Sequence, residues 1–286
     1  MKALFLFLLT CCSLQAVEFA SKKHVLYQNT PGTSLLRQIL DIHYHPSTVK
    51  TPKPVILWIH GGAWKFGSKT HSIGNKAKIF THEGYVLVAM NYRFHPKVAW
   101  QEQASDVAAA AQWIQKNIQT YGGDPKQMIL MGHSAGAHLA ALTGANPSYL
   151  KTAGVPYSHI RAAVLLDGAG YDLPSIMQSS HGQHLNLFQE IFGNDPKQLK
   201  AASPTHQFDE KRPAPDYLII PISSRAITIQ QSNNLAKAIK KSGNHAEVYV
   251  ARNRTHMTLN QKIGNPSDTP TKVILDFLKK SLAKKK

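Results

Sequence analysis

Cysteine is nearly absent from this chain of 286 residues, since only Cys11 and Cys12 occur and they are adjacent. If a leader that contains both is removed, the rest of the chain has no disulfide, no thiol nucleophile and no cysteine metal site. The remaining protein must then be held together by its hydrophobic core. A chain of this length can bury a core of sufficient size.

Acidic residues are also scarce, with 16 Asp and Glu against 33 Lys and Arg, which gives a net charge of +17. We interpret this excess as a basic, solvated surface. A weak attraction to anionic surfaces, such as lipid headgroups or acidic polysaccharide, is the alternative. No nucleic-acid-binding motif accompanies the charge, so we do not expect nucleic acid as a partner. The sequence does not indicate an oligomeric state.

Apolar runs are short, and the run at the N-terminus, Ala3–Cys12, is too short to span a bilayer comfortably. It follows Lys2 and precedes Ala16, a small residue suited to cleavage. Residues 1–16 therefore predict a signal peptide, and a secreted or periplasmic mature chain of residues 17–286. A lipid anchor on one of the two cysteines is a weaker alternative.

Strands and helices alternate along the chain, which predicts an α/β fold with a mainly parallel sheet and helices on both faces. Continuous apolar runs are typical of strands covered on both sides. The predicted helices are 104–118 and a second helix of which 235–241 is a part. The segment 171–215, after the sixth strand, is long for a connection and predicts a cap insertion. The predicted strands are 55–59, 85–90, 128–131, 162–166, 217–220 and 248–250.

Residues Gly132-His133-Ser134-Ala135-Gly136 fit the pattern Gly-x-Ser-x-Gly, which is typical of a nucleophile elbow. A predicted strand precedes them and a small, helix-permissive stretch follows, as an elbow requires. A Cβ at either flanking glycine would collide with the neighbouring strand or helix. The pattern therefore predicts Ser134 as a catalytic nucleophile, whereas without this context it would indicate an ordinary turn.

A second motif, His60-Gly61-Gly62-Ala63-Trp64, follows directly after the predicted strand 55–59. Acyl transfer places negative charge on the carbonyl oxygen, and backbone N–H groups can stabilise it. Paired glycines let the backbone approach a substrate closely. We expect the oxyanion hole to consist of the N–H groups of Gly61, Gly62 and Ala135.

Together these motifs resemble the esterase/lipase group of the α/β-hydrolase superfamily that carries a His-Gly-Gly motif. The chain is similar to the hormone-sensitive-lipase-like, feruloyl-esterase-like and arylformamidase-like branches over residues 35–283. Asn91-Tyr92-Arg93 and Tyr121-Gly122-Gly123-Asp124-Pro125 carry the resemblance further. It implies a serine hydrolase without a cofactor, and it implies that His60 supports the oxyanion loop.

The catalytic base should follow the last strand, because the order in this fold is serine, acid, histidine. His256 matches that position. The acid is harder to assign, because the family usually places it after the strand 217–220, where this chain reads Pro221 to Thr228 without Asp or Glu. Asp167, after the preceding strand, is our first candidate and Asp172 the second. A dyad without an acid, partly oriented by a polar group such as Ser224, is the third reading.

Aromatic residues near the two motifs are expected to form the substrate pocket, which we assign to Trp64, Phe66 and His133. The pair His43 and His45 is not expected to bind metal, because no Cys, Asp or Glu cluster completes a site; we interpret it as part of an exposed strand edge. The sequence thus predicts an exported carboxylesterase for small or medium acyl or aryl esters. An amide hydrolase with the same site, or a non-catalytic binding protein on this scaffold, is the alternative.

Overall fold

The computed structural model describes residues 19–46, 51–179, 181–209 and 212–283. The predicted signal peptide, both cysteines and the last three lysines lie outside these residues. Within the described ranges, no helix combines the length and the apolar character that a membrane span requires.

A single sheet of eight strands forms the centre of the molecule, in the order β1-β2-β4-β3-β5-β6-β7-β8. The first two strands pair antiparallel, as do β2 and β4, and all other neighbours run parallel. This confirms the predicted α/β class and the mainly parallel sheet. The strands are β1 (Ala20–Leu26), β2 (Ile39–Tyr44), β3 (Lys53–Ile59), β4 (Val86–Met90), β5 (Gly123–His133), β6 (Ile160–Leu166), β7 (Asp216–Ile220) and β8 (Ala246–Val248).

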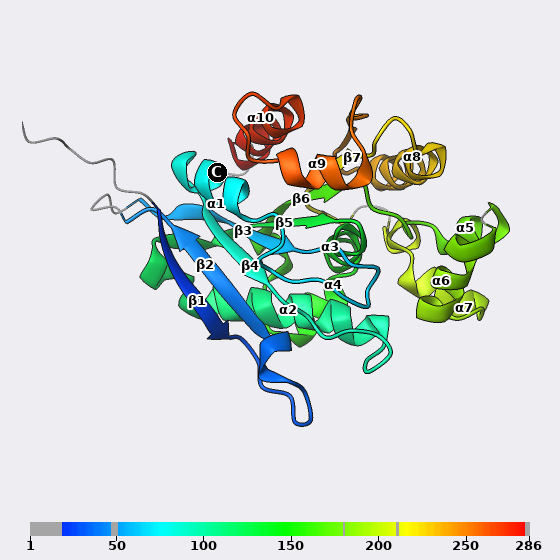
Figure 1. Ribbon diagram of the computed structural model, residues 1–286, viewed down its shortest axis with the longest axis horizontal. Coiled ribbons are helices and arrows are strands. Elements are labelled where there is room, and N and C mark those ends of the chain that lie inside the picture. The colour runs from blue at the N-terminus through cyan, green and yellow to red at the C-terminus, as the bar shows by residue number, and fades with distance from the viewer. Residues whose placement is uncertain (1–18, 47–50, 180, 210–211, 284–286) are drawn as a thin grey trace, which may run out of the picture.

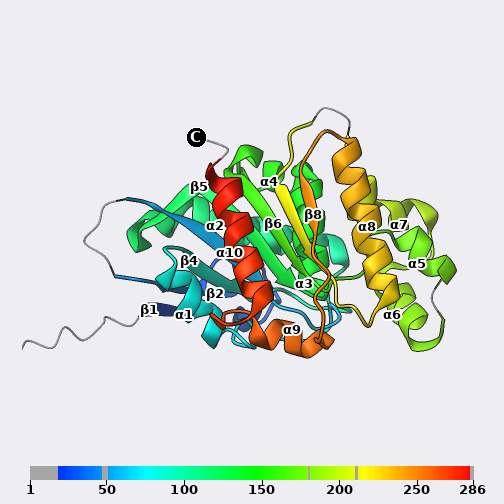
Figure 2. The same cartoon turned by 90° about the horizontal axis from the view of Figure 1, so that it is seen from above.

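Helices cover both faces of the sheet (Figures 1 and 2). On one face, α1 (Gly74–His82) and α10 (Thr269–Ala283) pack their apolar sides on the strands. On the other face, α2 (Trp100–Asn117), α3 (Ala135–Ala145) and α8 (Ala226–Lys241) enclose the larger core. The remaining helices outside the cap are α4 (Pro147–Thr152), α9 (His256–Lys262) and the short 3₁₀ turns η1 (Leu35–Arg37), η2 (Ile118–Tyr121) and η3 (Tyr157–His159), while a fourth turn, η4 (Pro204–His206), lies within the cap segment.

The segment between β6 and β7 forms three short helices at one end of the molecule (Figure 1). These are α5 (Leu173–Ser179), α6 (Gly182–Phe192) and α7 (Pro196–Ala202). They lie within the segment 171–215 that the sequence predicts as a cap. Phe188 and Phe192 of α6 pack edge-on against the buried ring of Trp64. The cap is therefore attached to the loop that follows β3.

Two sequence expectations need correction. The last strand was expected at 248–250, but β8 is Ala246–Val248; beyond it, Tyr249 and Ala251 donate to Ile219 and Pro221, and Ala251 forms only an isolated bridge with Ile222. His43 was expected on an exposed edge, but it is 5% exposed. The reason is that β1 pairs with β2 and covers it, and Ser21 Oγ lies 2.7 Å from the His43 Nδ1 atom.

Candidate active site

The predicted site residues lie at the carboxyl ends of parallel strands, where this class of sheet forms its binding crevice. Gly61 follows β3, Ser134 follows β5 and Asp167 follows β6. Ser134 and Asp167 are each bonded to the end of the neighbouring strand. The Ser134 N–H donates to the carbonyl of Leu166 at 2.9 Å, and the Asp167 N–H donates to the carbonyl of Ile220 at 2.8 Å. The ladder thus fixes the spacing of these loops.

Ser134 occupies a strained turn between β5 and α3, with φ 56° and ψ −122°. Non-glycine residues rarely adopt such a backbone, and strain of this kind is found mainly at functional sites. The turn is tight because α3 begins directly after Ser134 and its first turn packs against the end of β3. A Cβ on Gly136 would lie 2.1 Å from the carbonyl oxygen of Ile59, so only glycine fits there. This local geometry is that of the predicted elbow.

The loop after β3 exposes backbone N–H groups toward the same place. Among the described residues, the N–H groups of Gly61 and Gly62 have no hydrogen-bond acceptor. Gly62 has φ 131°, and a Cβ there would lie 1.9 Å from the carbonyl oxygen of Phe66. Ala135 is the first residue of α3, whose N–H has no acceptor within the helix. These three groups can donate to an oxyanion.

His60 holds this loop in place. Its ring stacks on Tyr92 with 4.5 Å between ring centroids, and its Nδ1 atom donates to the carbonyl of Gly61 at 2.7 Å. Burial lowers the pKa of His60 to about 4, so the ring is neutral near pH 7. A neutral, buried histidine is consistent with the supporting role that the resemblance implies.

His256 and Asp167 are in direct contact, with 2.6 Å between His256 Nδ1 and Asp167 Oδ2. Burial by itself would raise the pKa of Asp167, but the hydrogen bond from His256 and the charge of Arg225 outweigh it, so this pKa lies below its ordinary value. The carboxylate is therefore ionised and accepts the Nδ1 proton. In the described part of the chain, the other ring nitrogen of His256, Nε2, has no hydrogen-bond partner and can act as a base.

Arg225 is the residue that the sequence interpretation missed. It lies in the loop after β7, where the family usually carries its acid, and its Nη1 atom is 2.7 Å from Asp167 Oδ2 and 3.0 Å from His256 Nδ1. Both nitrogens are donors that point toward the same carboxylate oxygen. The second oxygen of Asp167 accepts from Thr228 Oγ1 at 3.1 Å and from the Ile222 N–H at 3.3 Å.

These contacts separate the three readings of the acid. Asp167 contacts His256, whereas Asp172 lies 3.1 Å from His206 in the cap region. Ser224 is exposed and has no hydrogen bond to the histidine among the described residues. The only sign of this ion pair in the sequence was an arginine in a loop that contains no Asp or Glu. By itself it did not indicate a partner on another strand.

His133 anchors the loop that carries His256. Its Nε2 atom donates to the carbonyl oxygen of His256 at 2.9 Å, and the two rings lie 4.4 Å apart between centroids. Burial, with a smaller contribution from the nearby His256, lowers the pKa of His133 to about 3. His133 lines a cavity, as the sequence interpretation expected, but it is 3% exposed and its main contact is with His256.

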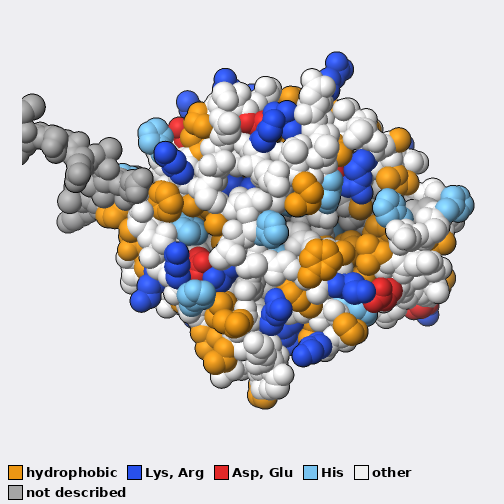
Figure 3. All heavy atoms as spheres, viewed as in Figure 1, with side chains coloured by type: hydrophobic (Ala, Val, Ile, Leu, Met, Phe, Trp, Pro, Cys, Tyr) orange, Lys and Arg blue, Asp and Glu red, His pale blue; other side chains and the backbone are white. Residues whose placement is uncertain are grey.

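Two cavities meet at Ser134, and Ala63 lines both. The larger, of 240 Å³, is bordered by Phe66, which is 63% exposed, and by His256. The smaller, of 110 Å³, is bordered by Trp64 and by cap residues of α5 and α6. On the face shown in Figure 3, hydrophobic and histidine side chains surround a hollow, with basic groups around them.

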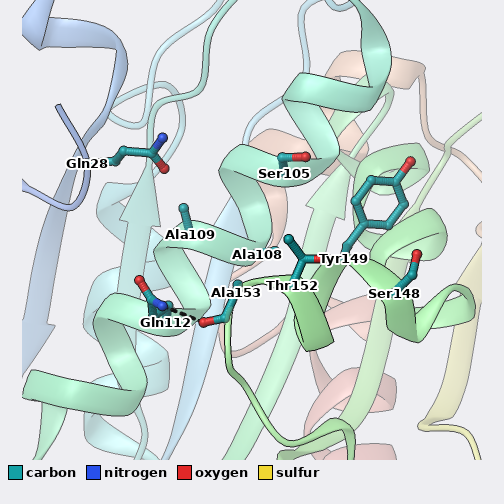
Figure 4. A pocket seen from close by; sticks show the side chains of 9 residues that line it. All are labelled: Gln28, Ser105, Ala108, Ala109, Gln112, Ser148, Tyr149, Thr152 and Ala153. Carbon is teal, nitrogen blue, oxygen red and sulfur yellow. Dashed lines mark hydrogen bonds between the residues drawn. The ribbon is translucent and has the colours of Figure 1, made fainter. Parts of the chain in front are cut away.

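Another cavity, of 430 Å³, lies between α2 and α4 and is larger than either of these. Figure 4 shows that its side chains come from those two helices and Gln28, and none is a histidine or a carboxylate. It lacks the groups for acid–base chemistry. In the described part of the chain, no group of three His, Cys, Asp or Glu could hold a metal ion.

Comparison with known proteins agrees with this geometry. A model of the BD-FAE family matches residues 40–239. LipM of Mycobacterium tuberculosis, named a probable carboxylic ester hydrolase, is 28% identical over 74% of this chain and 51% of its own. The kynurenine formamidase of Salmo salar is 34% identical over 56% of this chain and 51% of its own. The chain spans about half the length of these curated relatives.

Solved structures share the fold. A truncated carbohydrate esterase from gut microbiota has a TM-score of 0.74 at 24% identity, and covers 93% of this chain and 98% of its own. Esterase B of Lactobacillus rhamnosis has a TM-score of 0.75 at 18% identity, with 93% and 86% covered. Since the family model matches well over half of the chain, this protein belongs to the BD-FAE family, in the esterase/lipase group of α/β-hydrolases.

Proposed function

We propose that this protein is an exported serine hydrolase that cleaves carboxylic esters through an acyl-enzyme on Ser134. The contact between Asp167 and His256 is the observation that carries the proposal, because it supplies the carboxylate that the loop after β7 lacks. The missing acid was one of two observations in favour of a non-catalytic binding protein, and this contact argues against it; the other was the high positive charge.

In the first half of the reaction, the Ser134 hydroxyl attacks the ester carbonyl and His256 Nε2 takes its proton. The carbonyl oxygen becomes negative and accepts hydrogen bonds from Gly61, Gly62 and Ala135. His256 then gives the proton to the alcohol oxygen, and the bond between the carbonyl carbon and that oxygen breaks. Asp167 stabilises the imidazolium that forms in between.

In the second half, a water molecule attacks the acyl-enzyme with His256 again as the base. The proton returns to Ser134 as the acid leaves, which regenerates the site. Arg225 and Thr228 hold the two oxygens of Asp167 in place, and His133 holds the backbone of His256. These residues position the catalytic groups without contacting the reacting atoms in this scheme.

An amide substrate would use the same residues, and the similarity to a protein named kynurenine formamidase supports that second candidate. The two are separated by a matched pair of substrates, 4-nitrophenyl butyrate and the corresponding butyryl 4-nitroanilide. We expect turnover of the ester at a kcat/KM at least about 10³-fold above that of the anilide. Comparable values for both would favour the amide reading.

Export is proposed from residues 1–16 alone. The test is the mass and N-terminal sequence of the protein recovered from its native host. A mature chain that begins at residue 17 supports it, and an intact N-terminus with Met1 contradicts it.

A further inference from the structure

Among the residues that the structure describes, the smaller cavity beside Ser134 is lined by side chains with spare hydrogen-bond donors and by no carboxylate. Its apolar residues include Ile176, Leu187 and Phe188, and its polar residues include His184, Arg225 and Gln231. The apolar residues among them suit a short carbon chain. The polar residues decide what that chain can carry at its end.

Gln231 is the first of these donors. It lies on α8 and is 0% exposed, and its side-chain oxygen accepts the backbone N–H of Asp172 at 2.7 Å. That contact fixes the orientation of the amide, so its NH₂ group is the part that can bind a ligand. Among the described residues the Gln231 Nε2 atom has no hydrogen-bond partner. A buried donor left without an acceptor is unfavourable, and a ligand oxygen that accepts from it would remove that penalty.

Arg225 is the second donor. Its Nη1 atom serves Asp167 and His256, but the part of the chain that the structure describes provides no acceptor for its Nε and Nη2 atoms. A guanidinium carries five N–H groups, and the three on these two atoms are available to a ligand. Arginine binds carboxylates with particular strength, because its N–H groups match their two oxygens.

None of the described residues that line the two cavities is Asp or Glu, and the adjacent Asp167 carboxylate is already in contact with Arg225 Nη1. The exposed His184 adds a further donor to the smaller cavity. The net charge of +17 for the whole chain would also draw anionic molecules toward the protein. A cationic or purely aliphatic acyl group would leave the buried Gln231 Nε2 without an acceptor and would offer none to Arg225 Nε and Nη2.

We propose that the smaller cavity binds the terminal carboxylate of a short dicarboxylic acyl group, held by Arg225 and Gln231, so that the preferred substrates are half-esters of short dicarboxylic acids. This inference rests on the proposed ester hydrolysis at Ser134. It assigns to Arg225 a second role as a determinant of specificity, besides its contact with Asp167.

The test compares three 4-nitrophenyl esters of similar shape: the hemisuccinate, the levulinate and the 4-methylpentanoate. The first ends in a carboxylate, the second in a neutral ketone and the third in an apolar branch. We expect kcat/KM for the hemisuccinate, after subtraction of its spontaneous hydrolysis, to exceed the other two by at least about tenfold. Equal values for hemisuccinate and levulinate would overturn the proposal, since the cavity would then not recognise charge.

The decisive variant is Gln231→Glu, which keeps the acceptor for Asp172 and replaces the donor by a carboxylate. It should lower the preference for the hemisuccinate over the 4-methylpentanoate by at least about tenfold. Gln198→Glu on the exposed surface of α7 makes the same change of charge and should leave the preference unchanged. An unchanged preference in Gln231→Glu would overturn the assignment.

Arg225→Met is expected to lower the rate for all three esters, because Asp167 loses a partner, and to abolish the preference for the hemisuccinate as well. A loss of rate with the preference intact would show that Arg225 only positions Asp167. The proposed function is tested separately with 4-nitrophenyl acetate, whose acyl group does not reach the donors. If the wild type hydrolyses no ester, including the acetate, the proposed function fails; if it hydrolyses the acetate and shows no preference for the hemisuccinate, only this inference fails.

Discussion

Replacing Asp167 by Asn removes the charge of the carboxylate while it preserves the shape of the side chain. Four donors surround the two oxygens: His256 and Arg225 at Oδ2, and Thr228 and the Ile222 N–H at Oδ1. An amide has only one oxygen. If the oxygen stays at Oδ1, the NH₂ group faces His256 and favours the wrong tautomer of its ring. If it stays at Oδ2, the N–H of Ile222 loses its acceptor.

Either orientation should slow catalysis severely. In triads of this kind, loss of the acid through an Asp to Asn change lowers kcat by about 10⁴. We expect a fall of about 10³ to 10⁴ in kcat for Asp167→Asn, with KM nearly unchanged, measured with 4-nitrophenyl acetate. Asp172→Asn is the matched control and should stay within about threefold of the wild type, because Asp172 contacts His206 rather than His256.

Stability gives a second readout with a defined dependence on pH. Since the pKa of Asp167 is held below its ordinary value, its charge stabilises the fold above about pH 4, and this contribution is lost as pH falls through the lowered pKa. The variant should be less stable by about 1–3 kcal/mol at pH 7, with the difference shrinking in acid. A folded Asp167→Asn protein with near-normal kcat would refute the assignment of the acid.

Three further predictions follow from single contacts. Gly62→Ala should lower kcat at least about 10²-fold, because its Cβ would displace the oxyanion loop, whereas Gly74→Ala, where a Cβ meets open space, should match the wild type in the same assay. His133→Phe keeps the ring but loses the hydrogen bond to the His256 backbone, and it should lower kcat about tenfold without a change in fold by circular dichroism; unchanged kcat would contradict a positioning role. Burial lowers the pKa of Lys76 to about 7, so between pH 7 and 10 this lysine binds a proton in the unfolded chain but not in the folded one. The free energy of unfolding of the wild type should therefore rise with pH in this range relative to that of Lys76→Met. The same pH dependence in both proteins, measured by chemical denaturation, would contradict this.

Local sterics explain why much of the site could be predicted from the sequence. The strain at Ser134 and the close approach of Gly132 to the carbonyl oxygen of Gly136 are set by a few consecutive residues, so Gly-x-Ser-x-Gly between a strand and a helix indicates them directly. The buried strands likewise follow from continuous apolar runs such as 55–59. The chain order of serine, acid and histidine in this fold indicated His256 as the base, but it left Asp167 as one of several candidates for the acid.

The remaining features depend on contacts between distant segments. The role of Arg225 follows from the way the start of α8 packs beside the end of β6, which brings Nη1 within 2.7 Å of a carboxylate 58 residues away. No local pattern encodes that approach. The burial of His43 depends in the same way on a contact with β1. The residues of β1 are mostly polar and exposed, so their sequence did not predict a strand.

The most direct test of the central claim is covalent labelling of the protein with a fluorophosphonate, followed by mass spectrometry of its peptides. The reagent reacts with an activated serine and requires no knowledge of the substrate. We predict a single adduct on Ser134 that is absent from Ser134→Ala and much slower to form in Asp167→Asn. A folded wild-type protein that gains no adduct, or gains it elsewhere, would contradict the assignment of Ser134 as the nucleophile.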